Sequence, residues 1–427
     1  MNGRNALALV TVLFFSGLLV GGATGRALAN RLTDPYAGLD VLAQAMHIIE
    51  TQYVDPVPEG SIVNNAIDGM VSQLDEHSDW MGASAVDDLR EDTEGNFTGI
   101  GVVLVGKPDA VVISKVLPNS PAARDGVQPG DRVVAVDGND VSGLGVEDVQ
   151  QRISGERGVQ ATLELQRSAG TVTVNTVRDT VYLPAVQSEV LPDGTAYYRL
   201  RKFQRGSAEE LTALMKEHQG RAVILDLRDN PGGLLREAVG IVDLFLDQGT
   251  IVTTRDRDSV VETHTASVGG PAETLTPIVL INRRSASGSE IVAGALKDTK
   301  RGILVGETTY GKGSVQQLYR NRDGSALKLT VARYHTPSGA PILDKQGIEP
   351  DHAVAWPSAP SPKDQLRVAF SKLEQVDNDT KLELLTLIEQ LETPPQRRYR
   401  IPWEQTVTER LAADPQLAKA VELAQAL

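Results

Sequence analysis

The chain has 427 residues, which is too long for one ordinary compact domain and predicts about two to three. Hydrophobic residues make up 41% of it and charged residues 23%, as expected for a globular protein with a substantial core. The 42 Lys and Arg residues against 56 Asp and Glu give a formal net charge of −14, which argues against nucleic acid or anionic lipid as the main partner. Cysteine is absent, so disulfides, thiolate zinc sites and cysteine nucleophiles are excluded.

The first 29 residues have the layout of a secretory signal. Arg4 precedes an apolar run over residues 6–23, and Ala27-Leu28-Ala29 forms a small-x-small cleavage site. The run is close to the roughly 17–25 apolar residues of a membrane-spanning helix. We therefore expect residues 1–29 to be either a cleaved signal peptide or a retained N-terminal membrane anchor. Both outcomes predict export, with the protein expected in the cell envelope, in the periplasm or on the periplasmic face of the inner membrane.

Residues 30–96 are expected to form a helical N-terminal region. Residues 55–58 read as a turn between two runs whose apolar positions have helical spacing. These positions are Leu39, Leu42, Met46 and Ile49 in the first run, and Ile62, Ala66, Met70 and Leu74 in the second.

A change to short strands predicts a β-rich domain over residues 97–180. Its expected strands cover residues 100–105, 110–116, 132–136, 161–166 and 171–177, and its expected helices cover 121–125 and 146–154. A short glycine-rich loop opens the domain, and such a loop can hold a terminal carboxylate on its N–H groups beside a strand edge that pairs with a peptide. With Ser120-Pro121-Ala122-Ala123 and residues 130–138, the region resembles a PDZ domain, and the resemblance implies a substrate-binding site at Gly99, Ile100, Gly101 and Val102. A PDZ-like fold can also serve as a structural scaffold without binding a peptide.

Residues 181–356 alternate expected strands and helices, which predicts an α/β core with parallel pairing and helices packed on the sheet. The expected strands are 195–200, 222–227, 278–281 and 303–305, and the expected helices are 207–218, 234–246 and 287–298. Ligands of such sheets bind beyond the carboxyl ends of the strands, so the loops after residues 227 and 281 are candidate sites. Residues 357–427 begin with a Pro/Ser linker and are expected to be a helical C-terminal region, with helices at 365–373, 381–391 and 414–427.

Three segments of this core carry candidate chemistry, and each is ambiguous by itself. Residues 226–233 end in Pro-Gly-Gly, which is either a tight turn or a set of outward N–H groups suited to an oxyanion. Ser287 begins an expected helix, where it is either an ordinary N-cap or a nucleophile at the positive helix end. Lys312 lies between two glycines in residues 306–316, so its amine can enter a confined space where desolvation lowers a lysine pKa. The run does not match the phosphate-binding loop motif, because a glycine and not Ser or Thr follows the lysine, and this argues against nucleotide binding.

Taken together, in this order and spacing, the three segments resemble the carboxyl-terminal processing peptidases, also called tail-specific proteases. The resemblance covers about residues 36–351 and includes Leu74-Asp75-Glu76-His77-Ser78 and Gly347-Ile348-Glu349-Pro350-Asp351. It implies a ClpP/crotonase-like α/β protease core with an inserted PDZ domain and helical N- and C-terminal regions. The sequence departs from the family pattern at Gly288, where alanine is usual, and at Glu76, where proline is usual.

The resemblance also implies the roles of individual residues. Ser287 matches the family nucleophile, Lys312 the general base and Gln316 the glutamine that orients the lysine. The oxyanion donors match the backbone N–H groups of Gly288 and Gly233, with Gly232 as the neighbouring alternative. This predicts an acyl-enzyme mechanism that needs no metal, nucleotide or other cofactor.

The predicted function is a serine endopeptidase that cuts envelope proteins at or near their C-termini, with the PDZ domain binding the substrate C-terminus and gating the site. The expected partners are proteins and peptides with exposed C-termini, further copies of the chain in a homo-oligomer, and an activating adaptor where one is needed. Nucleic acid is not expected. The alternatives are a non-catalytic PDZ adaptor, an α/β hydratase or isomerase, and a Ser-His-Asp protease. The last needs a histidine base, for which the core offers His218, His264, His335 and His352, none of them in a triad motif.

Overall fold

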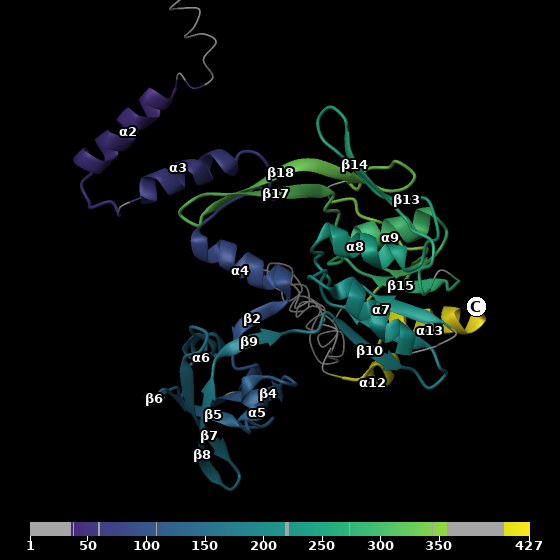
Figure 1. Cartoon of the computed structure of the whole chain (residues 1–427), viewed down its shortest axis with the longest axis horizontal. Helices are drawn as coiled ribbons and strands as arrows, with labels where there is room; N and C mark the ends of the chain where they lie inside the picture. The colour runs from purple at the N-terminus through teal and green to yellow at the C-terminus, as the bar shows by residue number, and fades with distance from the viewer. Residues whose placement is uncertain are drawn as a thin grey trace, which may run out of the picture. The chain divides into compact units, whose positions relative to one another are not determined.

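The structure is a computed structural model (Figure 1). The chain divides into two units, Met1–Trp80 and Met81–Leu427. The structure describes residues 36, 38–58, 60–107, 109–217, 222–272, 274–343, 345–356 and 405–427. The expected signal or anchor, the expected helices 365–373 and 381–391, and His218 lie outside the described residues. Within the described ranges, none of the helices combines the length and apolar character needed to span a membrane.

The first unit contains the two expected helices, α2 (Leu39–Gln52) and α3 (Ser61–Val71). Residues 55–58 lie outside both helices, as predicted. None of the α2 residues is buried, and Leu39, Leu42 and Ile49 are all exposed. The helical spacing therefore predicted the helix correctly, although its apolar stripe is not covered. β1 (Asp79–Met81) spans the boundary between the units.

The second unit begins with α4 (Ala83–Glu94), which the sequence analysis did not identify. β2 (Asn96–Gly99) follows it and pairs antiparallel with β9 (Asp179–Tyr182), so that Asn96 faces Tyr182 and Gly99 faces Asp179. The chain thus enters and leaves the β-rich domain through one two-stranded ribbon. We call this pair of strands the hinge ribbon.

The β-rich domain between the two strands has its own sheet and core. The sheet order is β3-β4-β5-β7-β8, with antiparallel pairing throughout. The buried core includes Ile113 of β4, Leu163 and Leu165 of β7, and Val149 of α6. The buried strand residues alternate with more exposed neighbours, which is typical of strands with one covered face. The elements are β3 (Val102–Lys107), β4 (Ala110–Val116), α5 (Pro121–Arg124), β5 (Arg132–Val136), β6 (Asn139–Asp140), α6 (Val146–Ile153), β7 (Gln160–Arg167) and β8 (Gly170–Val177). All strands and helices expected here are confirmed to within about two residues, and the expected strand 100–105 corresponds to β3.

The central sheet of the α/β core has the order β10-β11-β12-β15-β16-β19. All neighbours pair in parallel except β10 and β11, which are antiparallel. The two middle strands are entirely buried and continuously apolar up to Asp226, as expected for parallel strands covered on both faces. The strands are β10 (Val186–Val190), β11 (Ala196–Leu200), β12 (Val223–Asp226), β15 (Pro277–Ile281), β16 (Ile303–Gly306) and β19 (His352–Ala353).

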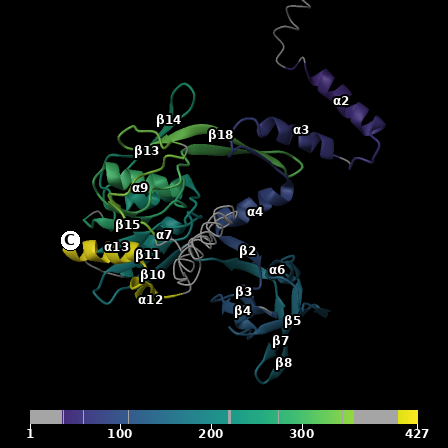
Figure 2. The same cartoon turned by 180° about the vertical axis from the view of Figure 1, so that it is seen from behind.

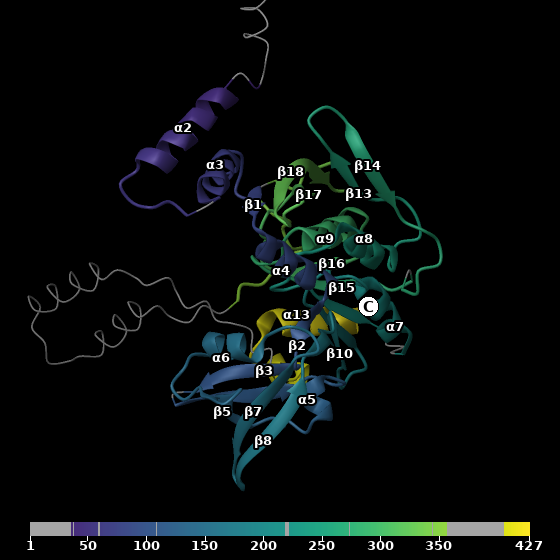
Figure 3. The ribbon, with the colours of Figure 1, turned by 60° about the vertical axis from the view of Figure 1, so that its left-hand side comes forward.

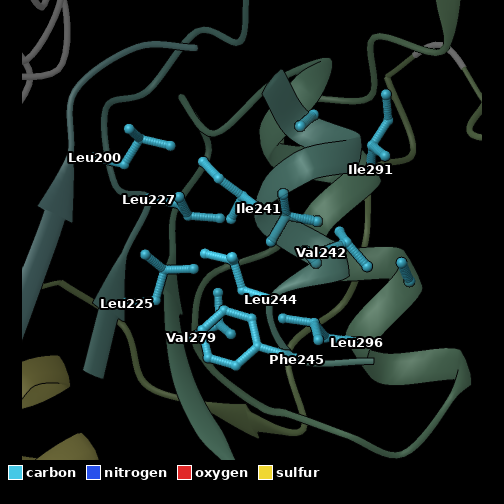
Figure 4. Packing of buried hydrophobic residues seen from close by; sticks show 14 of the residues in the cluster. Leu200, Leu225, Leu227, Ile241, Val242, Leu244, Phe245, Val279, Ile291 and Leu296 are labelled. Carbon is cyan, nitrogen blue, oxygen red and sulfur yellow. The ribbon is translucent and has the colours of Figure 1, made fainter. Parts of the chain in front are cut away.

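Helices cover both faces of this sheet (Figure 3). On one face lie α7 (Ser207–Glu217), α8 (Leu235–Asp243) and α9 (Gly288–Asp298), and Figure 4 shows Leu225, Val279 and Phe245 packed together beside α8. α12 (Val407–Leu411) precedes α13 (Pro415–Ala426), which contacts β12, β15 and β16. Leu417 and Ala420 of α13 belong to a second buried cluster, which also contains Ile224, Ile278 and Leu280 of the sheet.

A second, antiparallel sheet was not predicted from the sequence. It contains β13 (Thr250–Arg255), β14 (Val260–Thr265), β17 (Ser314–Arg320) and β18 (Ala326–His335), and Figure 2 shows β13, β14 and β18 beside one another. The sequence pattern gave little signal because β14 is almost wholly exposed and β18 is only partly buried, so neither shows a clean alternation.

A buried charge network attaches the C-terminal helices to the central sheet. Arg228 is 0% exposed and donates to both carboxylate oxygens of Asp226. Its remaining nitrogen donates to Asp414 at 2.9 Å and to Gln416 at 3.1 Å. Burial alone would raise the pKa of Asp226, but the charge and hydrogen bonds of Arg228, with the Tyr197 hydroxyl, hold it below its usual range. Asp414 also caps α13 by accepting from Leu417 N–H.

Replacing Asp414 by Ala should destabilise the protein strongly, because it leaves part of a buried guanidinium without its anion and removes a helix cap. Breaking a buried ion pair from one side costs about 3–5 kcal/mol. Urea unfolding of the variant against wild type measures the effect. Glu422→Ala on the same helix is the control, since its pair with Lys419 is exposed and worth about 0–1 kcal/mol. Equal effects of the two substitutions would contradict the importance of the network.

Candidate active site

The order of the central sheet brings the three candidate segments to one edge. The first segment follows β12, the second follows β15 and the third follows β16. These strands are direct neighbours and parallel, so their carboxyl ends lie at the same edge of the sheet. The loops after residues 227 and 281 were expected at this edge from the sequence, and the sheet order places the lysine loop after β16 at the same edge.

The loop after β12 is shaped by its asparagine and glycines. Asn230 is buried, donates to Leu200 C=O and accepts from Gly232 N–H at 2.9 Å. Gly232 and Gly233 have φ angles of 105° and 146°, a region that disfavours other residues. A Cβ at Gly233 would also lie 2.2 Å from Phe203 C=O. Only the Gly-Gly pair therefore allows this close approach of backbones.

Hydrogen bonds join the loop after β12 to the loop after β15. Asn230 C=O accepts from Ala286 N–H at 3.0 Å and from the Ser289 hydroxyl at 2.9 Å. The Ser285 hydroxyl donates to Leu227 C=O at 2.8 Å. A Cβ at Gly232 would be 2.8 Å from Ser287 Cβ, so the two loops touch directly at the candidate nucleophile.

Ser287 has a backbone conformation that is rare for a residue with a side chain. Its φ is 52° and its ψ is −109°, at the N-cap position of α9. Strain of this kind is found at functional sites when the surrounding structure enforces it, and it is the conformation of a serine on a sharp strand-to-helix turn. The N-cap and nucleophile interpretations of the sequence are thus compatible, because the capping position is the one that places a hydroxyl at the positive end of the helix.

The two expected oxyanion donors are available for a ligand. Across the described residues, neither Gly288 N–H nor Gly233 N–H donates a hydrogen bond. Gly232 N–H, the neighbouring alternative, is occupied by the Asn230 side chain. The geometry therefore favours Gly288 and Gly233 as the pair of donors, and their role stays a prediction.

Glu290 joins Ser287 to the lysine loop, and the sequence analysis did not single it out. Its carboxylate is 0% exposed. One oxygen accepts from Ser287 N–H at 2.8 Å and from Lys312 N–H at 2.7 Å. The other accepts from Gly311 N–H at 2.7 Å and from the Thr309 hydroxyl at 2.6 Å. A glutamate three residues after a helix-capping serine is the capping-box pattern, and this signal could have identified Glu290 from the sequence.

Lys312 is held where its amine is partly desolvated. Its neighbour Gly313 passes so close to another segment that a Cβ there would lie 1.7 Å from Ile342 C=O. Burial lowers the pKa of Lys312 below its ordinary value of 10.5, and the positive charge of Lys328 lowers it further, while Glu290 acts in the opposite direction. A lysine with a lowered pKa has a larger neutral fraction and can act as a general base.

The candidate base is not hydrogen-bonded to its expected partners. Among the described residues, no hydrogen bond joins Lys312 to Ser287 or to Gln316. The Gln316 side chain, on β17, donates instead to Ser314 at 2.8 Å and to Thr330 at 3.3 Å. The catalytic roles of all three residues remain predictions. Such contacts often tighten only when substrate is bound.

The described histidines lie elsewhere. His264 is on β14, His335 ends β18 and His352 begins β19. Within the part of the chain that the structure describes, no hydrogen bond joins a histidine to Ser287. The same ranges contain no group of three or more His, Asp or Glu side chains arranged to hold a metal ion.

The expected peptide-binding residues line a groove in the β-rich domain. Gly99, Ile100, Gly101 and Val102 lie along a groove of about 350 Å³ that also contacts α6. Gly101 has a φ of 84°, and a Cβ there would be 2.2 Å from Ser120 Cβ. Most of the lining is apolar. Besides the four expected residues, the groove is lined by Phe97, Val103, Leu104, Leu117, Gln150, Ile153, Ser154 and Leu183.

The chain is similar to known peptidases and contains a match to a known peptide-binding domain family. Residues 194–354 match peptidase family S41, and residues 112–167 match the PDZ domain. A carboxy-terminal-processing protease of Bartonella bacilliformis is 35% identical over 83% of this chain and 83% of its own length. A carboxyl-terminal-processing protease of Picosynechococcus is 34% identical over 82% of this chain and 89% of its own. A solved structure, the photosystem II D1 C-terminal processing protease, is 30% identical, covers 73% of this chain and 86% of that one, and has a TM-score of 0.44.

The fold and these matches define a serine peptidase with an α/β core and a PDZ domain. The chain belongs to peptidase family S41, with the carboxyl-terminal processing proteases as its relatives, and it is a peptide hydrolase.

Replacing Glu290 by Ala should abolish most activity, because four donors lose their shared acceptor and the Ser287 and Lys312 loops lose their link. We expect a loss of at least about 100-fold in kcat/KM, the cost of a displacement near 1 Å at a reacting centre. Steady-state hydrolysis of an unfolded protein measures it, with circular dichroism to check folding. Glu307→Ala is the control, since its partner Arg283 is exposed. Activity within a few-fold of wild type for Glu290→Ala would contradict the linking role.

Proposed function

We propose that the protein is a Ser-Lys endopeptidase that cuts exported proteins at or near their C-termini. The observation that carries this proposal is the shared Glu290 oxygen, which accepts from the N–H groups of both Ser287 and Lys312. It fixes the backbones of the candidate nucleophile and base beside each other, next to two N–H groups without partners in the described structure.

In the proposed reaction, neutral Lys312 takes the proton of the Ser287 hydroxyl as the oxygen attacks the peptide carbonyl carbon. The carbonyl oxygen becomes negative and is stabilised by Gly288 N–H and Gly233 N–H. The Lys312 ammonium then protonates the leaving amine as the C–N bond breaks, leaving an acyl-enzyme. Water then attacks the ester carbon as Lys312 takes one of its protons. The Lys312 ammonium returns a proton to the Ser287 oxygen as the ester C–O bond breaks, which releases the acid and restores the Ser287 hydroxyl and neutral Lys312.

The groove of the β-rich domain supports capture of a substrate C-terminus. β3 pairs with β4 on one side only within the described sheet, so its other edge can accept an extended peptide as an added strand. The apolar lining favours an apolar terminal residue. The location in the cell envelope, the homo-oligomer and any activating adaptor remain predictions. The exposed apolar stripe on α2 supports the homo-oligomer.

One observation favours the alternative of a non-catalytic adaptor. The described side chains of Ser287 and Lys312 are not hydrogen-bonded to each other. A protein that only binds C-termini would use the same groove without needing this contact.

Incubation with an unfolded protein that ends in an apolar residue separates the two functions. Wild type should produce fragments visible by mass spectrometry, and Ser287→Ala should produce none, because the attacking oxygen is lost. Ser289→Ala is the matched control and should still cleave, since its hydroxyl donates to Asn230 C=O and is not the proposed nucleophile. Intact, bound substrate in every tube would favour the adaptor.

The pH dependence of kcat/KM should follow the neutral form of Lys312. Because the pKa of Lys312 is lowered, activity should rise with pH through this pKa and be lost as pH falls below it. Lys328→Met removes a neighbouring positive charge, so the pKa of Lys312 and the rising limb should move to higher pH. Lys328→Arg keeps the charge and should leave the limb in place. A limb that moves equally in both variants, or in neither, would contradict the electrostatic explanation.

A further inference from the structure

Phe203 holds both proposed oxyanion donors in place. It follows β11 and is 0% exposed. Its N–H donates to Gly232 C=O at 3.0 Å, and its C=O accepts from Leu234 N–H at 2.7 Å, so its backbone brackets Gly233. Its ring lies against Gly288, where a Cβ would be 2.9 Å from Cδ2. Phe203 therefore hydrogen-bonds to the backbone on both sides of Gly233, and its ring packs against Gly288.

The neighbours of Phe203 contact the base of the hinge ribbon. Lys202 forms an ion pair with Asp92. The Gln204 side-chain amide donates to Leu183 C=O at 2.6 Å. Arg205 makes two hydrogen bonds to Glu94, at 2.6 and 2.7 Å, and its N–H donates to Thr93 C=O at 2.9 Å.

These partners are the residues through which the β-rich domain is attached. Residues 92–95 lead directly into β2, and Leu183 directly follows β9. The two sides are joined because Leu183 N–H donates to Gly95 C=O at 2.9 Å. The Gln204 side chain fills the space beside Gly95, where a Cβ would lie 2.2 Å from its nitrogen.

We propose that residues 202–205 are a coupling segment that transmits the position of the hinge ribbon to the oxyanion hole, with Phe203 as the positioning residue. The inference rests on the proposed function, because it takes Gly233 and Gly288 as the oxyanion donors. Lys202, Gln204 and Arg205 hold the ribbon side, and Phe203 holds the active-site side. When the hinge ribbon shifts, the backbone of the segment shifts with it.

The coupling acts on the chemical step. Oxyanion donors stabilise the transition state only when they lie about 2.7–3.1 Å from the developing charge, and loss of one donor costs about 10²–10³ in kcat. A displacement near 1 Å costs about 10² in rate. A loosened segment should therefore lower kcat and leave substrate capture in the groove unchanged.

The test uses the full chain with Gln204→Ala, Arg205→Gln and Phe203→Leu. Each should lower kcat on a protein substrate by about 10-fold or more, with KM within about twofold of wild type. Binding of a fluorescent C-terminal peptide to the groove, followed by anisotropy, should be unchanged, and the same peptide with an amidated end should bind weakly to all forms. The charge-reversed pair Glu94→Arg with Arg205→Glu should recover most of the kcat lost in Arg205→Gln.

Arg90→Gln is the matched control. Arg90 is an exposed arginine on α4 that pairs with Asp87, so the substitution removes the same charge close by without touching residues 202–205. It should keep the kcat of wild type.

Three results would overturn the coupling: wild-type kcat in Gln204→Ala and Arg205→Gln, an equal loss in Arg90→Gln, or a parallel loss of peptide binding. Phe203→Leu keeps the proposal testable if one of the polar variants fails to fold. A wild type that cleaves nothing, or a Ser287→Ala variant that cleaves, would instead overturn the proposed function and the coupling with it.

Discussion

The candidate site depends on one buried carboxylate. Glu290 accepts four hydrogen bonds, two on each oxygen, from Ser287 N–H and from the loop that carries Lys312. A fully buried charge is costly unless several donors surround it, and here three backbone N–H groups and a hydroxyl do so. Because these donors belong to loops from two different strands, the carboxylate fixes both loops against each other. The strained backbone of Ser287 is maintained by this arrangement.

A departure from the family pattern has a structural explanation. Alanine is usual at position 288 in the family pattern, but a Cβ at Gly288 would lie only 2.9 Å from Phe203 Cδ2. The Phe203 ring therefore packs directly against Gly288, and the Phe203 backbone also brackets Gly233. Because Phe203 and Gly288 are far apart in the sequence, a linear motif cannot indicate this contact.

Charge supports the other end of the same loop. Arg228 precedes the Gly-Gly pair by a few residues, and its guanidinium donates both to Asp226 of β12 and to Asp414, the N-cap of α13. The C-terminal segment therefore does more than cover the sheet, since Asp414 supplies an anion to the loop that carries a proposed oxyanion donor.

The sequence by itself determined the local features of this protein. The strands from Ala110 to Val116 and from Arg132 to Val136, and the helices around Ser207 and Gly288, follow from period and capping signals within a few residues of one another. The three chemical segments and the family followed from their order and spacing. These features depend only on neighbours along the chain, so a linear pattern contains them.

Tertiary structure decided how distant segments meet. The second sheet, Glu290, Phe203 and the pairing of Arg228 with Asp414 all connect residues far apart in the sequence. The preference for Gly233 over Gly232 as the proposed donor also depends on the structure, because the Asn230 side chain accepts from Gly232 N–H. Hydrogen-bond partners and contact surfaces of this kind arise only when the sheet order brings the loops together. The sheet order cannot be predicted from any single segment of the sequence.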